Sequence, residues 1–143
     1  MLKLSRMGNA FLFKSEPHVY SIDLFAKDKK TNWDHVRNYQ ARNVLRACKK
    51  GDQALIYHSG DEKAVVGLAL VIKEAYPDLD SEKAGDWVQI DLKFVQKFKT
   101  PVTLATIKKT LALKDLPLIK QSRLSCMPVT KKDFDLLIEL GGA

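Results

Sequence analysis

The chain has 143 residues, the length of one ordinary domain, and can build a hydrophobic core without disulfides or metals. Hydrophobic residues make up 45% and charged residues 29%, no apolar run approaches a membrane span of roughly 20 residues, and there are two cysteines. These totals argue against an integral membrane protein and a disulfide-rich secreted one, while the net charge of +7 favours a polyanionic partner.

The sequence before residue 52 predicts one strand and two helices. The sequence "AFLFKS" (10–15) is typical of an apolar strand that ends polar, and Ser21 caps a short helix after it. "KDKKTN" (27–32) predicts a loop. A second helix is predicted from about 36 to 50, with Gly51 ending it, because apolar residues recur with the helical period. These residues are Ala41, Val44, Leu45 and Cys48.

The remainder predicts a curved, mostly antiparallel sheet with helices inserted between its strands. Three segments have the apolar or alternating pattern of strands: 53–59, 64–76 and 87–98. Gly67 marks a bulge or bend, and 77–86 is a turn-rich acidic loop. Thr103 and Thr130 cap two helices, and 116–129 is a loop leading to a short strand. The class is therefore α+β, with a barrel-like sheet.

Positive charge is concentrated in two segments. Residues 37–50 carry five basic side chains and no acid, and residues 93–123 carry eight against one acid. Residues 51–92 carry nine acidic side chains against three basic ones. If the two basic segments meet in the fold, they form a face that attracts phosphate, whereas lysines on unrelated surfaces are the alternative. The side chains predicted to bind phosphate are Arg37, Arg42, Arg46, Lys97, Lys99 and Lys120.

Polar and aromatic side chains gather where the predicted strands end and where the second helix begins. Each alone has a plainer interpretation, since Trp33 could simply pack and His58 could be a hydrogen-bonded core residue. Together they predict a small pocket with aromatic faces, hydroxyls and amides, and few carboxylates, a lining that suits a nucleobase. The candidate pocket residues are Ser15, Trp33, Asn38, Tyr39, Tyr57, His58, Ser59, Arg123 and Ser125.

Motifs for other chemistry are missing from the sequence. No two histidines have the spacing of zinc ligands, and there is no Walker loop, GxGxxG or GxSxG motif. We therefore expect no metal and no cofactor. Spacing leaves a hydrolytic triad open because its members can lie far apart in the sequence, but nothing marks a nucleophile, so we expect no catalytic residue.

Six short blocks in this order resemble the EVE domain family. They are "FKSEPxxYSI", "WDxVRNYQARN", "YHS", "AYPD", "FVxKF" and "SRLSxxPV", and the likeness runs from about Phe11 to Leu140. The resemblance implies a PUA-like fold, a small mostly antiparallel β-barrel with surrounding helices. Residues 1–10 would be a tail and the start of the first strand, and 11–143 a single EVE domain. The family's pocket motifs match Ser15, Trp33, Asn38, Tyr39, His58, Ser59, Arg123 and Ser125.

Two departures from the family pattern concern the predicted pocket. His35 stands where many relatives have glycine in "WDGVRN". The loop between Tyr76 and Trp87 is shorter than in many relatives. Ligand preference is therefore expected to transfer from the family less directly than the fold does.

The resemblance implies a nucleic-acid-binding module that holds a modified base, either a modified cytosine in DNA or a modified RNA base. The alternative is an enzyme, a ribonuclease or a hydrolase acting on a modified base or nucleotide, with His58 as general acid/base. A protein-interaction domain is a third possibility. We expect a binding module that is a monomer, has no membrane partner and is cytoplasmic, or nucleoid-associated or nuclear if DNA is the ligand.

Overall fold

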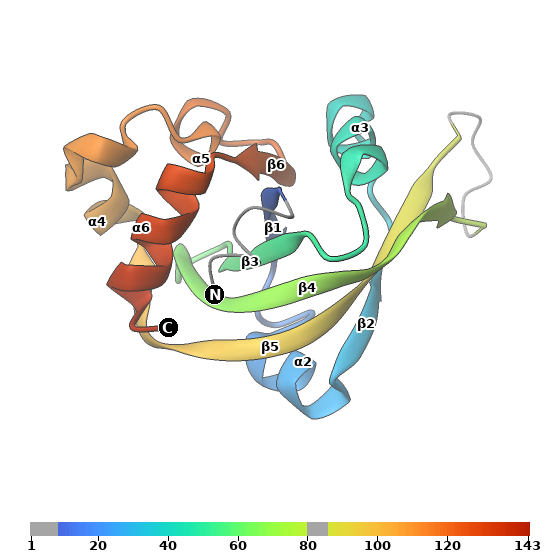
Figure 1. The fold of residues 1–143 in the computed structure, drawn as a ribbon, viewed down its shortest axis with the longest axis horizontal. Helices are drawn as coiled ribbons and strands as arrows, with labels where there is room; N and C mark the ends of the chain where they lie inside the picture. The colour runs from blue at the N-terminus through green and yellow to red at the C-terminus, as the bar shows by residue number, and fades with distance from the viewer. Residues whose placement is uncertain (1–8, 80–85) are drawn as a thin grey trace.

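The computed structural model describes residues 9–79 and 86–143 and contains a six-stranded sheet in the order β2-β5-β4-β3-β1-β6 (Figure 1). Strands β1 and β3 pair in parallel, and the other ladders are antiparallel. The strands are β1 Ala10–Ser15, β2 Lys30–Trp33, β3 Gln53–His58, β4 Ala64–Pro77, β5 Val88–Thr103 and β6 Cys126–Val129. The helices are α2 Ile22–Asp28, α3 Tyr39–Ala47, α4 Leu104–Lys109, the 3-10 turn η1 Leu111–Leu113, α5 Pro117–Lys120 and α6 Lys131–Gly141.

The predicted α+β class is confirmed, but the expected barrel is not closed. The two ends of the sheet are β2 and β6, each four residues long, and no ladder joins them within the described residues. Figure 1 shows β4 and β5 as a long bent ribbon, with α4, α5 and α6 gathered at one end of the molecule. Helix α3 packs on β6, so a helix rather than a closing strand neighbours that edge.

The centre of the sheet forms the core that supports the candidate site. Strands β1 and β3 are apolar along most of their length because neighbouring elements cover both of their faces. Leu12, Phe13 and Leu55 are fully buried. Helix α3 adds the predicted apolar stripe, in which Ala41, Leu45 and Cys48 are buried and Val44 is partly buried.

Two segments predicted as loops are regular elements. Residues 30–33 form strand β2, which pairs Lys30 with Lys93 and Trp33 with Ile90 of β5. This strand has no periodic pattern of its own and depends on a partner about sixty residues away. Residues 117–120 form the short helix α5, which begins with Pro117 at a position where the missing N–H costs nothing.

The second helix is shorter than predicted at both ends. Asn38 is its N-cap, and its side-chain oxygen accepts a hydrogen bond from the Ala41 N–H at 2.9 Å. Cys48 is the C-cap, so Gly51 does not end the helix. Instead Gly51 lies in the following turn with φ +96°, a conformation that suits glycine.

The other predicted caps and the bulge are confirmed. Ser21, Thr103 and Thr130 cap α2, α4 and α6 through their hydroxyl oxygens. Gly67 sits at a register shift of β4, where an added Cβ would overlap Ile22 of α2. Part of the predicted acidic loop (80–85) and of the N-terminal tail (1–8) lies outside the described residues. Within the described ranges, no helix is long and apolar enough to cross a membrane.

Candidate functional site

A cleft of about 520 Å³ opens between the end of β1 and strand β2. One wall is the segment that leaves β1 and leads into α2, and the other is β2 with the two residues after it. The cleft is lined by Lys14, Ser15, Glu16, Val19, Tyr20, Thr31, Asn32, Trp33, Asp34 and His35. It therefore combines two aromatic rings, hydroxyls, an amide and charges of both signs.

Trp33 is the largest aromatic surface in this cleft. Its backbone is fixed by pairing with Ile90 of β5, and its side chain is half-buried. The indole lies 5.7 Å from the ring of the fully buried Phe13 and 6.5 Å, edge to face, from Tyr20. One part of the indole thus rests on the core, and the remainder is available to a flat ligand.

The wall after β1 is held by hydrogen bonds to its backbone. The Ser15 hydroxyl donates to the Tyr20 carbonyl at 2.6 Å, and the Ser59 N–H donates to the Ser15 carbonyl at 2.9 Å. The buried His58 accepts from the Ile22 N–H through Nε2 at 3.0 Å. Because Nε2 is an acceptor, its proton is on Nδ1, which donates to Glu62 at 2.7 Å. His58 therefore fixes the start of α2, with both ring nitrogens engaged.

The opposite wall is a polar network around Asp34. The Asn32 amide donates to Asp34 at 3.1 Å and to Gln89 at 2.9 Å. The His35 imidazole lies 3.5 Å from the same Asp34 carboxylate. This network gives the cleft a rim of hydrogen-bonding side chains beside the indole of Trp33.

A second, shallower depression of about 300 Å³ contains two more of the predicted pocket residues. It is lined by Asn38, Gln40, Gln121, Ser122, Arg123 and Leu124. Lys14 bridges it to the cleft, because its Nζ donates to the Ser122 carbonyl at 2.7 Å while its N–H donates to the Ser125 carbonyl. Burial lowers the pKa of Lys14.

The nine predicted pocket residues are thus only partly brought together. Ser15 and Trp33 line the cleft, and Asn38 and Arg123 line the depression. Apart from Tyr39, the others lie within β3, directly after it or directly before β6: Tyr57 is buried with Lys14 Nζ 5.9 Å from its ring centroid, and burial raises its pKa. Ser125 contributes its carbonyl to β1.

Tyr39 belongs to a different surface, formed by one face of α3 and the start of β5. Its exposed ring stacks on Trp87 with centroids 5.1 Å apart. The Arg42 guanidinium lies 5.0 Å from the Tyr39 ring, and that of Arg37 lies 5.7 Å from Trp87. Arg46 donates to the Asp86 carbonyl. Three arginines predicted to bind phosphate are therefore clustered around one aromatic stack.

The lysines predicted to bind phosphate lie on other elements. Lys97 of β5 pairs with Asp23 at 2.8 Å, and Lys120 of α5 pairs with Asp115 at 3.1 Å. Lys99 lies on β5 beside Gly142, after α6. These three lysines of the second basic segment therefore lie on other elements than the arginines of the first segment.

Several cleft residues were missed at the sequence level. They are Lys14, Val19, Tyr20, Thr31, Asn32 and Asp34. Most of them lie on β2 or opposite it, and the signal that would have found them is the strand character of 30–33. Tyr20 could have been found from its place one residue before the Ser21 cap.

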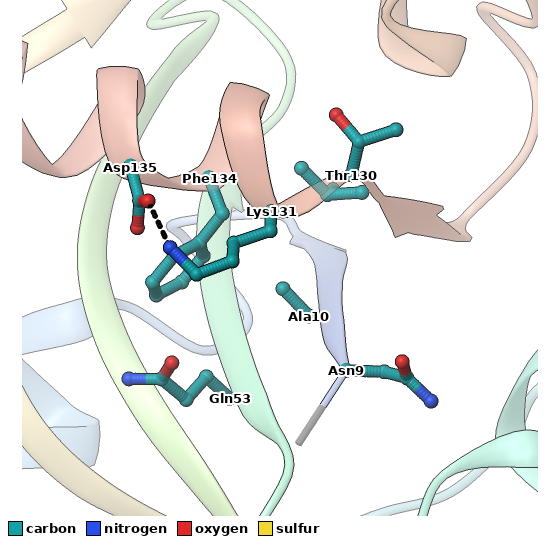
Figure 2. Close-up of a pocket in the computed structure, with 8 residues that line it drawn as sticks. Asn9, Ala10, Gln53, Thr130, Lys131, Phe134 and Asp135 are labelled. Atoms are coloured by element: carbon teal, nitrogen blue, oxygen red, sulfur yellow. Dashed lines mark hydrogen bonds and ion pairs between the residues drawn. The ribbon is translucent and has the colours of Figure 1, made fainter. Parts of the chain in front are cut away.

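A smaller pocket of about 140 Å³ lies where α6 starts, next to Ala10 of β1 (Figure 2). Figure 2 shows the Lys131–Asp135 ion pair on its rim, and the nine pocket candidates are not among its lining residues. Across residues 9–79 and 86–143, no three His, Cys, Asp or Glu side chains are grouped as a metal ion would require.

The protein is thus a small α+β domain with a mixed sheet and a tryptophan-lined cleft at the end of β1 that is a candidate ligand site. The EVE domain model matches residues 9–140, and the chain belongs to the EVE domain family, with its PUA-like fold. Human thymocyte nuclear protein 1 is 36% identical over 170 residues, which cover 96% of this chain and 76% of that protein. The mouse protein of the same name is 38% identical over 167 residues, or 94% and 74% of the two chains.

Solved structures of this family superpose over nearly the whole chain. A hypothetical protein from Leishmania major has a TM-score of 0.89 at 38% identity, covering 96% of this chain and 97% of its own. Human thymocyte nuclear protein 1 in complex with DNA containing 5-methylcytosine has a TM-score of 0.86 at 33% identity, covering 95% and 99%. An ASCH protein from Zymomonas mobilis, 13% identical with a TM-score of 0.59, shares the fold alone.

Proposed function

We propose that this protein binds nucleic acid and holds a modified base, in the first place 5-methylcytosine in DNA, in the Trp33 cleft. The observation that carries this proposal is the half-buried indole, supported from behind by Phe13 and open to a cleft of about 520 Å³. The complex of human thymocyte nuclear protein 1 with 5-methylcytosine DNA supports the choice of ligand.

The contacts follow from the chemistry of a base. A base drawn out of its strand is flat, so the indole face would stack on it, while the hydroxyls, amide and carboxylate of the rim would read its edge. The arginines of α3 and Arg123 would meet the flanking phosphates and supply the salt-dependent part of binding. In a cell, DNA binding would place the protein in the nucleus or with the nucleoid.

The test is the affinity of Trp33→Ala for a 5-methylcytosine oligonucleotide. Stacking of one base is worth about 1–3 kcal/mol, so we expect binding to weaken about tenfold or more. Leu111→Ala is the control, because it also shortens an exposed apolar side chain but lies on η1, outside the cleft and away from the arginines of α3. Thermal unfolding and circular dichroism verify that both variants fold. Equal affinities of a folded Trp33→Ala variant and the wild type would refute the cleft assignment.

We also propose that the protein is a binding module rather than an enzyme. The support is the position of His58, the residue that a hydrolytic mechanism would need: it is buried, with both nitrogens in hydrogen bonds to Ile22 and Glu62. Such an imidazole holds a wall and does not face a substrate. The experiment is incubation with RNA, methylated DNA and modified nucleosides, with no turnover expected. Turnover that is lost in His58→Ala would overturn this proposal.

A further inference from the structure

His35 has a backbone conformation that its side chain does not favour. Its φ is +60°, in the left-handed region, where a residue with a Cβ is less stable than glycine by roughly 1–2 kcal/mol. Non-glycine residues adopt it in a few per cent of cases, with histidine among the more tolerant types. A glycine would fit this position of the main chain better.

The conformation is imposed by a buried carboxylate. The His35 N–H donates to Asp78 Oδ2 at 2.9 Å, and the same oxygen accepts from Arg37 Nη1 at 3.0 Å. The Asp78 side chain is 1% exposed, so these hydrogen bonds are shielded from water. The backbone at 35 is therefore held by contacts that any residue type could make, glycine included.

The His35 imidazole itself contributes little to the stability of the fold. It is 67% exposed, and its contact with Asp34, at 3.5 Å between Nε2 and Oδ2, is that of a surface pair worth little stability. It does, however, line the Trp33 cleft. The side chain is thus costly for folding and well placed for a ligand.

We infer that His35 determines specificity in the cleft, where its imidazole contacts the bound base. This rests on the proposed function. The contact is with the base and not with a phosphate, because the carboxylates of Asp34 and Glu16 line the same cleft and would repel an anion, while the Nζ of Lys14, also in the lining, donates to the Ser122 carbonyl. The Nε2 side of the imidazole lies near Asp34, so the ring face and the Nδ1 side remain for the ligand.

The decisive variant is His35→Gly, tested for stability and for binding together. We expect its melting temperature to rise by about 2–4 °C, because the left-handed strain is relieved. We expect its affinity for a 5-methylcytosine oligonucleotide to fall about fivefold, and its affinity for the same oligonucleotide with cytosine to change less. Stability and binding would therefore move in opposite directions.

Lys29→Gly is the matched control. Lys29 has φ +69°, caps the C-terminal end of α2 and does not line the cleft. The melting temperature of this variant should rise by a similar amount, and its affinity should stay within about twofold of the wild type. A second variant, His35→Asn, keeps a residue type that tolerates the left-handed region but lacks the ring, and should lose affinity as His35→Gly does.

Each outcome separates the two proposals. If the wild type binds and His35→Gly binds equally well, the role of His35 is refuted while the proposed function stands. If His35→Gly lowers the slope of log affinity against log salt by about 1, the contact is to a phosphate and the inference is overturned. If the wild type binds neither methylated nor unmethylated DNA or RNA, the proposed function fails and this inference with it.

Discussion

At the scale of single residues, polar side chains beside the cleft hold the main chain that shapes it. Ser15 and His58 fix the wall after β1, and Asp78 fixes the turn after β2. A buried polar group needs such partners, since leaving one unpaired costs about 1–3 kcal/mol. The ligand-facing surface therefore depends on residues that do not themselves have to touch a ligand.

The two cysteines lead to a prediction at this scale about pH and stability. Burial raises the pKa of both thiols, that of Cys126 to about 12, whereas a thiol in the unfolded chain ionises near pH 9. As pH rises above 9, the unfolded state loses these protons first. The stability contributed by the neutral thiols is complete below pH 9 and is lost progressively from pH 9 towards 12.

We therefore expect the free energy of unfolding, measured in urea, to fall above pH 9 by up to about 1.4 kcal/mol per pH unit for each thiol. The double variant Cys48→Ala/Cys126→Ala lacks both groups and should show a shallower decline between pH 9 and 10. Its lower absolute stability does not matter, because the slopes are compared. Parallel declines in the two proteins would show that other groups control this pH range.

At the scale of elements, the entrance of α3 illustrates what a capping residue does. Asn38 was predicted as a base-reading residue, and its side-chain oxygen accepts from the Ala41 N–H. We expect Asn38→Ala to lower the free energy of unfolding by about 1 kcal/mol, measured by urea denaturation. Asn38→Asp retains a capping oxygen and should unfold at nearly the wild-type midpoint. Equal losses in the two variants would show that the amide group, and not the cap, matters here.

Elements that have a local sequence pattern could be predicted from the sequence, whereas only some of the cleft residues could. The stripe of α3 and the caps at Ser21 and Thr130 depend on residues a few positions apart, which a sequence displays directly. Strand β2 depends on β5, far along the chain. Trp33 was identified as a candidate by its residue type. Most of its cleft neighbours were not, because they lie on β2 or on the segment after β1, and only the tertiary fold brings these two segments face to face.

At the scale of the whole molecule, the net charge of +7 does not say which charges a nucleic acid would meet. Lys97 and Lys120 each lie within 4 Å of a carboxylate, which compensates them locally. Arg46 on α3 and Arg123 in the depression beside the cleft are both exposed. If the Trp33 cleft holds the base, we expect the flanking phosphates to contact Arg46 and Arg123 more than Lys97 and Lys120.

Two double variants that remove the same charge test this arrangement. For Arg46→Gln/Arg123→Gln we expect the slope of log affinity against log salt, for a methylated duplex, to fall by about 2, because each lost phosphate contact removes about 0.9. Lys97→Gln/Lys120→Gln should change the slope by less than about half of that. Both variants have the same net charge, so a difference between them reports where the nucleic acid lies. Equal slopes would mean that the protein attracts nucleic acid through its overall field, with no defined phosphate contacts beside the cleft.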